Sequence, residues 1–348
     1  MRYGTVQSPG ELEAVGLPGP RGPLTAFLLD HLRQPPHRLP RGPEPDDDPL
    51  YGDDAALALY VLYELHYRGF AGVDDGWEWE PSLLAFRCRL EQGFEARMLE
   101  EAGPGLPTTD VAAALYEVTR SAGGPSLSSF MAEQGTLAQL REFAIHRSAY
   151  QLKEADPHTW AIPRLRGAPK AAMVEIQADE YGDGVERDMH QTLFGVTMRA
   201  LGLDVRYGAY VDVLPGATLA TVNLVSFLGL HRRWRGALVG HLAVFEMTSV
   251  EPMGRYSLAM RRLGYGPVAR HFYEVHVVAD AHHEQVAANQ LAASLAAQDP
   301  RMAADILLGA RSIMAVEGNL SANLLAAWAA GGTALLRPVE VLGVAAVA

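Results

Sequence analysis

One segment of the sequence, HFYEVHVVADAHHEQ, carries metal-binding residue types at helical spacing. His276, Asp280 and His283 stand at positions i, i+4 and i+7, so they fall on one stripe of an α-helix. Two imidazoles and a carboxylate suit iron, manganese or zinc, whereas calcium prefers oxygen ligands alone. The same residues would also fit a solvated helix face, so this pattern alone leaves a metal site and a polar surface both open.

Two further segments favour the metal. Glu246 lies within GALVGHLAVFEMTSV, a helical pattern so apolar that an unpaired carboxylate there would be costly. The segment VEIQADEYGDGVERDMHQTLF adds Glu180 and His190. The three carboxylates and three histidines together are enough for two metal ions, with positions left open for dioxygen and a substrate.

The separation of Glu180 from His190 requires a break in the helix. Ten residues of regular helix would put the two side chains about 15 Å apart and on different faces. Gly182 and Gly184 lie between them, and two closely spaced glycines can unwind the chain and bring its ends together. Asp183 stands seven residues before His190 and satisfies the helical spacing better, so it is the alternative ligand to Glu180.

On these residues the sequence resembles the haem-oxygenase-like di-iron oxidases, the iron-containing redox enzymes, over roughly residues 142–290. In that family the first core helix supplies a Glu and a downstream His, the second a Glu, and the third a His-x-x-x-Asp-x-x-His motif. The resemblance implies that two iron ions are held by a set of six residues. These are Glu180, His190, Glu246, His276, Asp280 and His283.

The resemblance also sets the expected function. It implies an all-α, haem-oxygenase-like helical bundle, a homodimer, and O2 as co-substrate of a reaction that passes through a peroxo-diferric intermediate. We expect oxygenation of the nitrogen of a small, amino-acid-derived amine. Oxidative C–C cleavage or decarboxylation of an amino or fatty acid at the same site is the alternative reaction, and a non-catalytic helical binding scaffold is the alternative class. The electron donor is left open.

Two segments rich in charge within apolar patterns are candidates for holding the substrate. YELHYRGF contains Glu64 and Arg68, and HRSAYQLKEADPHTW contains Tyr150 and Lys153. The second segment also holds His146, Arg147, Glu154 and His158. The competing interpretation is that these residues form polar bridges between helices, since buried charges are usually paired for structural reasons.

Composition excludes several classes of protein. The formal net charge of −12 and the pI near 5.5 argue against a nucleic-acid binder, which would need a basic surface, and disfavour anionic membranes. The sequence has one cysteine, no apolar signal-peptide core near its start, and no apolar run long enough to span a bilayer. A cytoplasmic enzyme is therefore expected.

Gly, Pro and short polar breaks separate a series of helical patterns, which predicts a bundle with little strand. Residues 1–50 are rich in proline and glycine and predict an irregular arm. Residues 51–135 predict accessory helices, residues 136–330 the di-iron core, and residues 331–348 a C-terminal tail.

Overall fold

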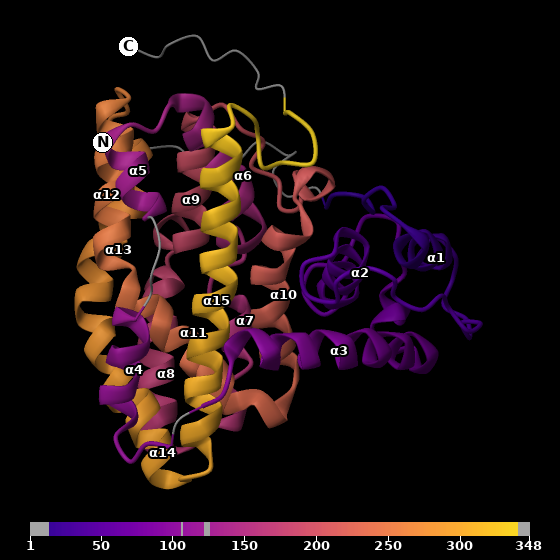
Figure 1. Cartoon of the computed structure of the whole chain (residues 1–348), viewed down its shortest axis with the longest axis horizontal. Helices are drawn as coiled ribbons and strands as arrows, with labels where there is room; N and C mark the ends of the chain where they lie inside the picture. The colour runs from indigo at the N-terminus through magenta and orange to yellow at the C-terminus, as the bar shows by residue number, and fades with distance from the viewer. Residues whose placement is uncertain (1–13, 106, 122–125, 340–348) are drawn as a thin grey trace.

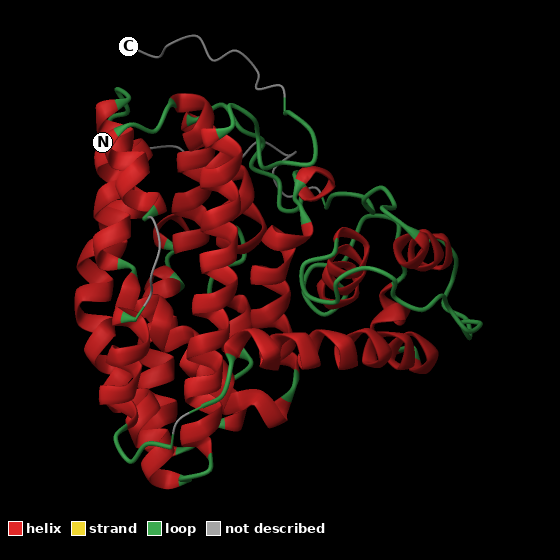
Figure 2. Cartoon of the chain, viewed as in Figure 1, coloured by secondary structure: helices red, strands yellow, loops and turns green. Residues whose placement is uncertain are grey.

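The computed structural model describes residues 14–105, 107–121 and 126–339, and helices make up nearly all of its regular structure (Figures 1 and 2). The α-helices are α1 (Pro23–Leu32), α2 (Asp53–Glu64), α3 (Pro81–Ala102), α4 (Val111–Arg120), α5 (Leu127–Glu133), α6 (Leu137–Gln151), α7 (Asp156–Thr159), α8 (Gly167–Glu180), α9 (His190–Ala200), α10 (Gly216–Leu230), α11 (Arg235–Thr248), α12 (Val250–Arg262), α13 (Pro267–Gln285), α14 (Ser294–Gln298) and α15 (Met302–Ala329). A π-helix, Val286–Ala293, joins α13 to α14. Extended pairing within the described ranges is limited to one bridge, between Gly16 and Ala71. The predicted all-α class is confirmed.

The N-terminal arm is more ordered than its composition suggested, because residues 23–32 form α1. The helix begins with Pro23, which suits a first turn. Its free N–H groups are satisfied by a distant residue: the carboxylate of Asp54 accepts from the backbone of Leu24 at 2.8 Å and of Thr25 at 2.9 Å. Because the cap is supplied from thirty residues away, Pro23 alone did not outweigh the composition of the segment, which predicted an irregular arm.

The accessory helices do not form one unit. Figure 1 shows α1, α2 and α3 beside the main bundle, whereas α4 and α5 lie on the bundle itself. In agreement with this view, α4 packs against α11 and α15, and α5 packs against α12. The predicted boundary at residue 135 therefore does not coincide with a division in the packing.

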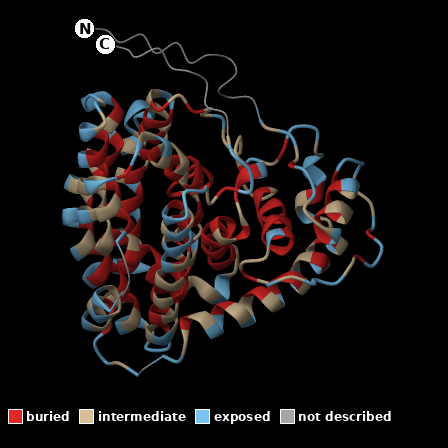
Figure 3. Ribbon diagram, turned by 45° about the horizontal axis from the view of Figure 1, so that its top comes forward, coloured by how far each residue is buried: buried red, intermediate tan, exposed pale blue. Residues whose placement is uncertain are grey.

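The centre of the bundle depends on the close approach of α11 and α15. Gly240 on α11 faces the carbonyl oxygen of Ile306, and Gly309 on α15 faces that of Ala237, so closely that a Cβ atom at either position would overlap the facing backbone. The two glycines thereby allow the short distance between α15 and α11, the helix that carries Glu246. Figure 3 shows that buried residues gather on the inward faces of the bundle helices.

Within the described residues, no helix combines the length and the apolar character that crossing a lipid bilayer requires.

Candidate metal centre

The structure brings the six predicted ligands together in the interior of the bundle. Two groups of donor atoms form, each with its atoms within 4.8 Å of one another. The first group contains Glu154, Glu180, His190 and His276, and the second contains Glu180, Glu246, Asp280 and His283. All seven residues are buried. Because Glu180 belongs to both groups, its carboxylate is placed to bridge two cations.

Glu154 is the member of the cluster that the sequence did not assign to the metal. It follows the end of α6 in a turn in which its own N–H donates to Gln151 and the N–H of Lys153 donates to Tyr150. The next residue, Ala155, has a φ of 73°, an uncommon backbone conformation that turns the chain away. The carboxylate of Glu154 lies 3.7 Å from His276 Nε2.

Helix α13 presents the His276, Asp280 and His283 stripe as its spacing predicted. The opposite face is solvated, with Val278 77% exposed. The Nδ1 atom of His276 lies 2.7 Å from the carbonyl oxygen of Phe272, and a proton donated there leaves Nε2 free for a metal. His282 points outward, where it pairs with Glu175 at 3.0 Å.

The predicted break between Glu180 and His190 is present. Helix α8 ends at Glu180, and α9 begins at His190. In the connecting loop Gly182, Asp183 and Gly184 all have positive φ angles, of 59°, 51° and 81°. The loop doubles back so that His190 Nδ1 lies 2.9 Å from Glu180 Oε2. Asp183 is exposed in this loop and stands outside both donor groups, so the geometry favours Glu180 over Asp183.

The carboxylates of the cluster repel one another strongly. Burial raises the pKa of Asp280, and the neighbouring Glu246 raises it further, to about 9. Burial also raises the pKa of Glu246 well above its ordinary value, and the charge of Glu180 adds to this effect. Burial alone would raise the pKa of Glu180, but His190, His276 and His283 lower it to about 2. Although burial opposes the change, Glu180 raises the pKa of His190, and Glu154 raises that of His276 well above its ordinary value. Without a metal these histidines therefore carry the positive charge that bound cations would otherwise supply.

Two divalent cations fit this donor set. Both carboxylate oxygens of Asp280 are buried without a hydrogen-bond partner among the described residues. The other buried donor atoms of the cluster are satisfied only by ion pairs within it, Glu180 Oε2 with His190 Nδ1 at 2.9 Å and Glu246 Oε2 with His283 Nδ1 at 3.4 Å. Orphaned buried polar atoms are costly, and their gathering in one place requires an explanation. Four carboxylates would balance the charge of two divalent ions, and a mixture of carboxylates and imidazoles suits iron or manganese.

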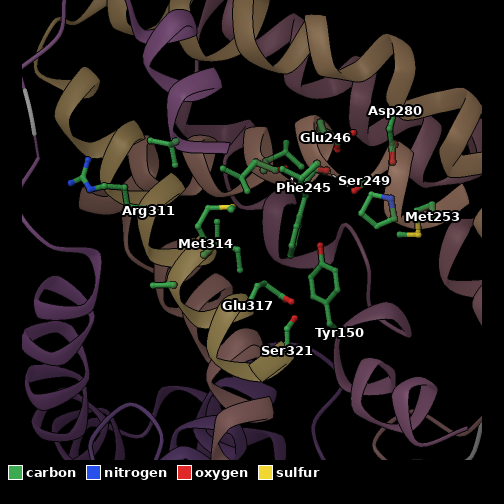
Figure 4. Close-up of a pocket in the computed structure, with 18 of the residues that line it drawn as sticks. Tyr150, Phe245, Glu246, Ser249, Met253, Asp280, Arg311, Met314, Glu317 and Ser321 are labelled. Atoms are coloured by element: carbon green, nitrogen blue, oxygen red, sulfur yellow. Dashed lines mark hydrogen bonds between the residues drawn. The ribbon is translucent and has the colours of Figure 1, made fainter. Parts of the chain in front are cut away.

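A large cavity opens directly onto the cluster. Its volume is about 1150 Å³, and the ligand candidates Glu154, Glu180, Glu246, His276 and Asp280 form part of its wall. Apolar side chains cover much of the remainder, among them Leu242, Val244, Phe245, Met253, Ile313 and Met314. Figure 4 shows Tyr150 with Glu317 on one side and the cluster residues Glu246 and Asp280 on the other. A small organic molecule in this cavity would meet the metal centre.

Only one of the four predicted substrate residues, Tyr150, lines the cavity. Glu64 and Lys153 form a buried ion pair elsewhere, and the hydroxyl of Tyr207 donates to Glu64 at 2.6 Å. Arg68 donates to the carbonyl of Leu152 and to Gln191. These three residues bridge helices, as the competing interpretation expected, and we do not assign them to the substrate.

His158 and His241 form a second buried pair close to the cluster. His158 Nε2 lies 3.0 Å from His241 Nδ1, and burial lowers the pKa of His158 to about 3 and that of His241 well below its ordinary value. Neither residue belongs to a donor group. Burial therefore keeps the pair neutral, and His158 also lines the cavity.

Comparison with known proteins agrees with this site. The chain is 26% identical over 140 residues to a protein named nitrosourea synthase from Streptomyces achromogenes subsp. streptozoticus. The match covers 40% of this chain but only 30% of that synthase. The model of the iron-containing redox enzyme family matches residues 141–318, half of the chain and the part that holds every residue of the cluster. The chain is an oxidoreductase and belongs to the iron-containing redox enzyme family.

Proposed function

We propose that this protein is a non-haem di-iron oxygenase that uses O2 to oxygenate the nitrogen of a small, amino-acid-derived amine. The observation that carries the proposal is the pair of donor groups that share Glu180. A single metal would use one group and leave the carboxylates of the other buried and unbalanced. The similarity to a protein whose name places its chemistry at a nitrosourea supports nitrogen as the target.

When bound, the two irons would supply the electrons and coordination positions that O2 activation requires. Glu154, Glu180, His190 and His276 would hold one ion, and Glu180, Glu246, Asp280 and His283 the other. Carboxylates suit this task because they can change between terminal and bridging modes. The apolar part of the cavity wall, with Phe245 and Met314, would favour an apolar portion of the substrate beside the centre.

The hydroxyl of Tyr150 is available as a hydrogen-bond donor to a ligand in the cavity. Burial raises the pKa of its hydroxyl well above the ordinary value, and the carboxylates of Glu154, Glu180 and Glu246 act in the same direction. The phenol therefore stays protonated and can donate a hydrogen bond from Oη to a group in the cavity. Its expected role is to orient the substrate through this hydrogen bond.

The proposed reaction balances with an external reductant. A secondary or primary amine, O2, two electrons and two protons give the N-hydroxylated amine and one water. The N–H bond becomes N–O–H, and the second oxygen atom leaves as water. Two equivalents of a one-electron reductant would supply the electrons.

The experiment combines iron-loaded protein, a one-electron reductant and ¹⁸O-labelled O2 with a panel of amino acids and their amine derivatives. The proposal predicts a product heavier by one labelled oxygen, with the label on nitrogen. Loss of CO2 or a shortened carbon skeleton would instead identify decarboxylation or C–C cleavage. If the protein binds no iron and consumes no O2 with any substrate, it is a non-catalytic binding scaffold, and the proposal is wrong.

Two matched variants distinguish the loss of a metal ligand from damage to the fold. His276→Ala removes a ligand candidate and is expected to abolish product, whereas His282→Ala changes a solvent-exposed histidine on the same helix and is expected to leave product formation near the wild-type level. Equal loss in both variants would mean that damage to α13, and not loss of a ligand, explains the effect.

A further inference from the structure

Arg147 and Glu317 form an ion pair in the wall of the cavity that contains the metal cluster. Arg147 Nη1 and Nη2 donate to the two oxygens of Glu317, each at 2.7 Å, so the pairing is bidentate. The residues come from α6 and α15 and both line the cavity. Their side chains keep 20% and 19% exposure, so the pair is accessible from the cavity although it is largely buried.

The other charged residues of the cavity wall have different roles. Glu154, Glu180, Glu246 and Asp280 belong to the metal cluster. Asp110 is exposed and caps α4 by accepting from Ala113 at 3.0 Å, and Glu117 is exposed and pairs with Arg120. Arg311 donates to the carbonyl of Ala102. Among the described lining residues outside the metal cluster, Arg147 and Glu317 are opposite charges that lie together in the cavity wall.

We propose that the Arg147–Glu317 pair opens to receive the zwitterionic head group of an α-amino acid, with the carboxylate on Arg147 and the ammonium on Glu317. This inference rests on the proposed function, because it places the rest of the substrate toward the metals. Arg147 presents the planar fork that matches a carboxylate, and Glu317 offers oxygens to an ammonium group. One ion pair is replaced by two, so the net charge of Arg147, Glu317 and the bound head group remains zero.

The order of the wall residues indicates how the bound amino acid would lie. Arg147 and Tyr150 stand at i and i+3 on α6, and Glu154 of the cluster follows in the turn after the helix. All three residues line the cavity. An amino acid with its head group at Arg147 would extend past Tyr150 and present a side-chain nitrogen to the cluster.

The experiment measures binding to the iron-loaded protein without O2, so that it does not depend on turnover. Isothermal titration would compare L-lysine with 6-aminohexanoate, which lacks the α-amino group, and with cadaverine, which lacks the carboxylate. L-ornithine and L-arginine extend the series. In wild type at least one of the three amino acids should bind, and lysine should bind roughly 10- to 100-fold more tightly than either analogue, as for the loss of one charged hydrogen-bond partner.

Each single variant should abolish the preference for lysine over one of the two analogues. In Glu317→Gln, lysine and 6-aminohexanoate should bind equally, because the ammonium has lost its partner. In Arg147→Gln, lysine and cadaverine should bind equally. Arg311→Gln, a cavity arginine outside the proposed site, is the matched control and should retain the wild-type preferences.

The double variant Arg147→Gln/Glu317→Gln guards against misfolding, because removing both partners leaves no unpaired charge. It should melt near the wild-type temperature and lose both preferences. The proposal is overturned if no amino acid of the series binds to wild type, or if the variants keep the wild-type order of affinities. N-oxygenation could fail while this binding pattern holds, so the two proposals are separately testable.

Discussion

At the scale of single residues, Glu180 defines the site. It is common to both donor groups, and His190, His276 and His283 keep its pKa at about 2 against the effect of burial. Six of the seven cluster residues were predicted: His276, Asp280 and His283 from helical spacing, Glu246 from its apolar helix, and Glu180 and His190 through the family resemblance. Glu154 was not, because it lies in a turn after α6 and has no periodic partner. Its position is determined by the tertiary fold alone.

The buried His158–His241 pair provides a residue-scale prediction. Their pKa values in the folded state lie below the unfolded value of about 6.5. The unfolded chain therefore binds protons that the folded protein does not, and the free energy of unfolding falls as pH drops below about 6.5. Each histidine contributes up to about 1.4 kcal/mol per pH unit.

His241→Asn removes one of these groups and keeps a polar atom for His158. Urea unfolding of metal-free protein at pH 7, 6 and 5 should show a shallower loss of stability in the variant than in wild type. His282→Asn, a change of an exposed histidine on α13, is the control for replacing a histidine outside the buried pair. If the His241→Asn and wild-type curves were parallel, the buried pair would not be neutral in the folded protein.

At the scale of elements, the loop between α8 and α9 decides whether Glu180 and His190 meet. The sequence indicated that a break was needed and that the glycines supplied it. The sequence did not show how the loop brings His190 back to Glu180, because this depends on contact between the two ends of the loop. A Cβ atom on Gly182 would overlap the backbone of Asp188 and Met189, whereas one on Gly184 would meet nothing within 4 Å.

Gly182→Ala and Gly184→Ala therefore form a matched pair. Both replace a glycine of positive φ and should cost about 1–2 kcal/mol of stability from that strain. Only Gly182→Ala must also push the loop open and separate His190 from Glu180. We expect at least a tenfold loss of iron affinity, comparable to the disturbance of a ligand's support, and near-normal affinity for Gly184→Ala. Anaerobic competition against a chromophoric chelator would measure both, and equal affinities would contradict the role given to the loop.

The contact between α11 and α15 provides a second test at this scale. Gly240→Ala places a methyl group against the backbone of α15 and should destabilise the protein by about 3 kcal/mol, at the upper end for an overpacked core. Gly318→Ala lies on α15 where nothing approaches within 4 Å, and should stabilise by about 0.5–1 kcal/mol through helix propensity. Chemical unfolding distinguishes them. A neutral Gly240→Ala would mean that the helices are not held at this distance.

At the scale of the whole molecule, long periodic segments were predictable and their assembly was not. The helical patterns around Glu246 and around His276 correspond to α11 and α13 of the structure. Helix α1 lies in the segment predicted as an irregular arm and is capped by the distant residue Asp54. Helix α12 follows α11 after a single residue, Ser249, so no clear break in the sequence separates the two. The accessory helices pack in two places, beside the bundle and on it, and this depends on tertiary contacts that no local sequence pattern predicts.

At the same scale, two sets of buried charge lie in one part of the bundle. Four carboxylates and three imidazoles form the cluster, and the Arg147–Glu317 ion pair lies in the wall of the cavity that several cluster residues line. Under the two proposals, cations would balance the charge of the first set, and the amino-acid head group would exchange with the second.

The central claim is that two irons bind with Glu180 between them, and the most direct measurement is anomalous diffraction at the iron edge from crystals of anaerobically loaded protein. We predict two peaks per chain, one within the Glu154, Glu180, His190 and His276 group and one within the Glu180, Glu246, Asp280 and His283 group. A single peak per chain at saturating iron, or peaks that lie outside these two groups, would contradict the di-iron centre.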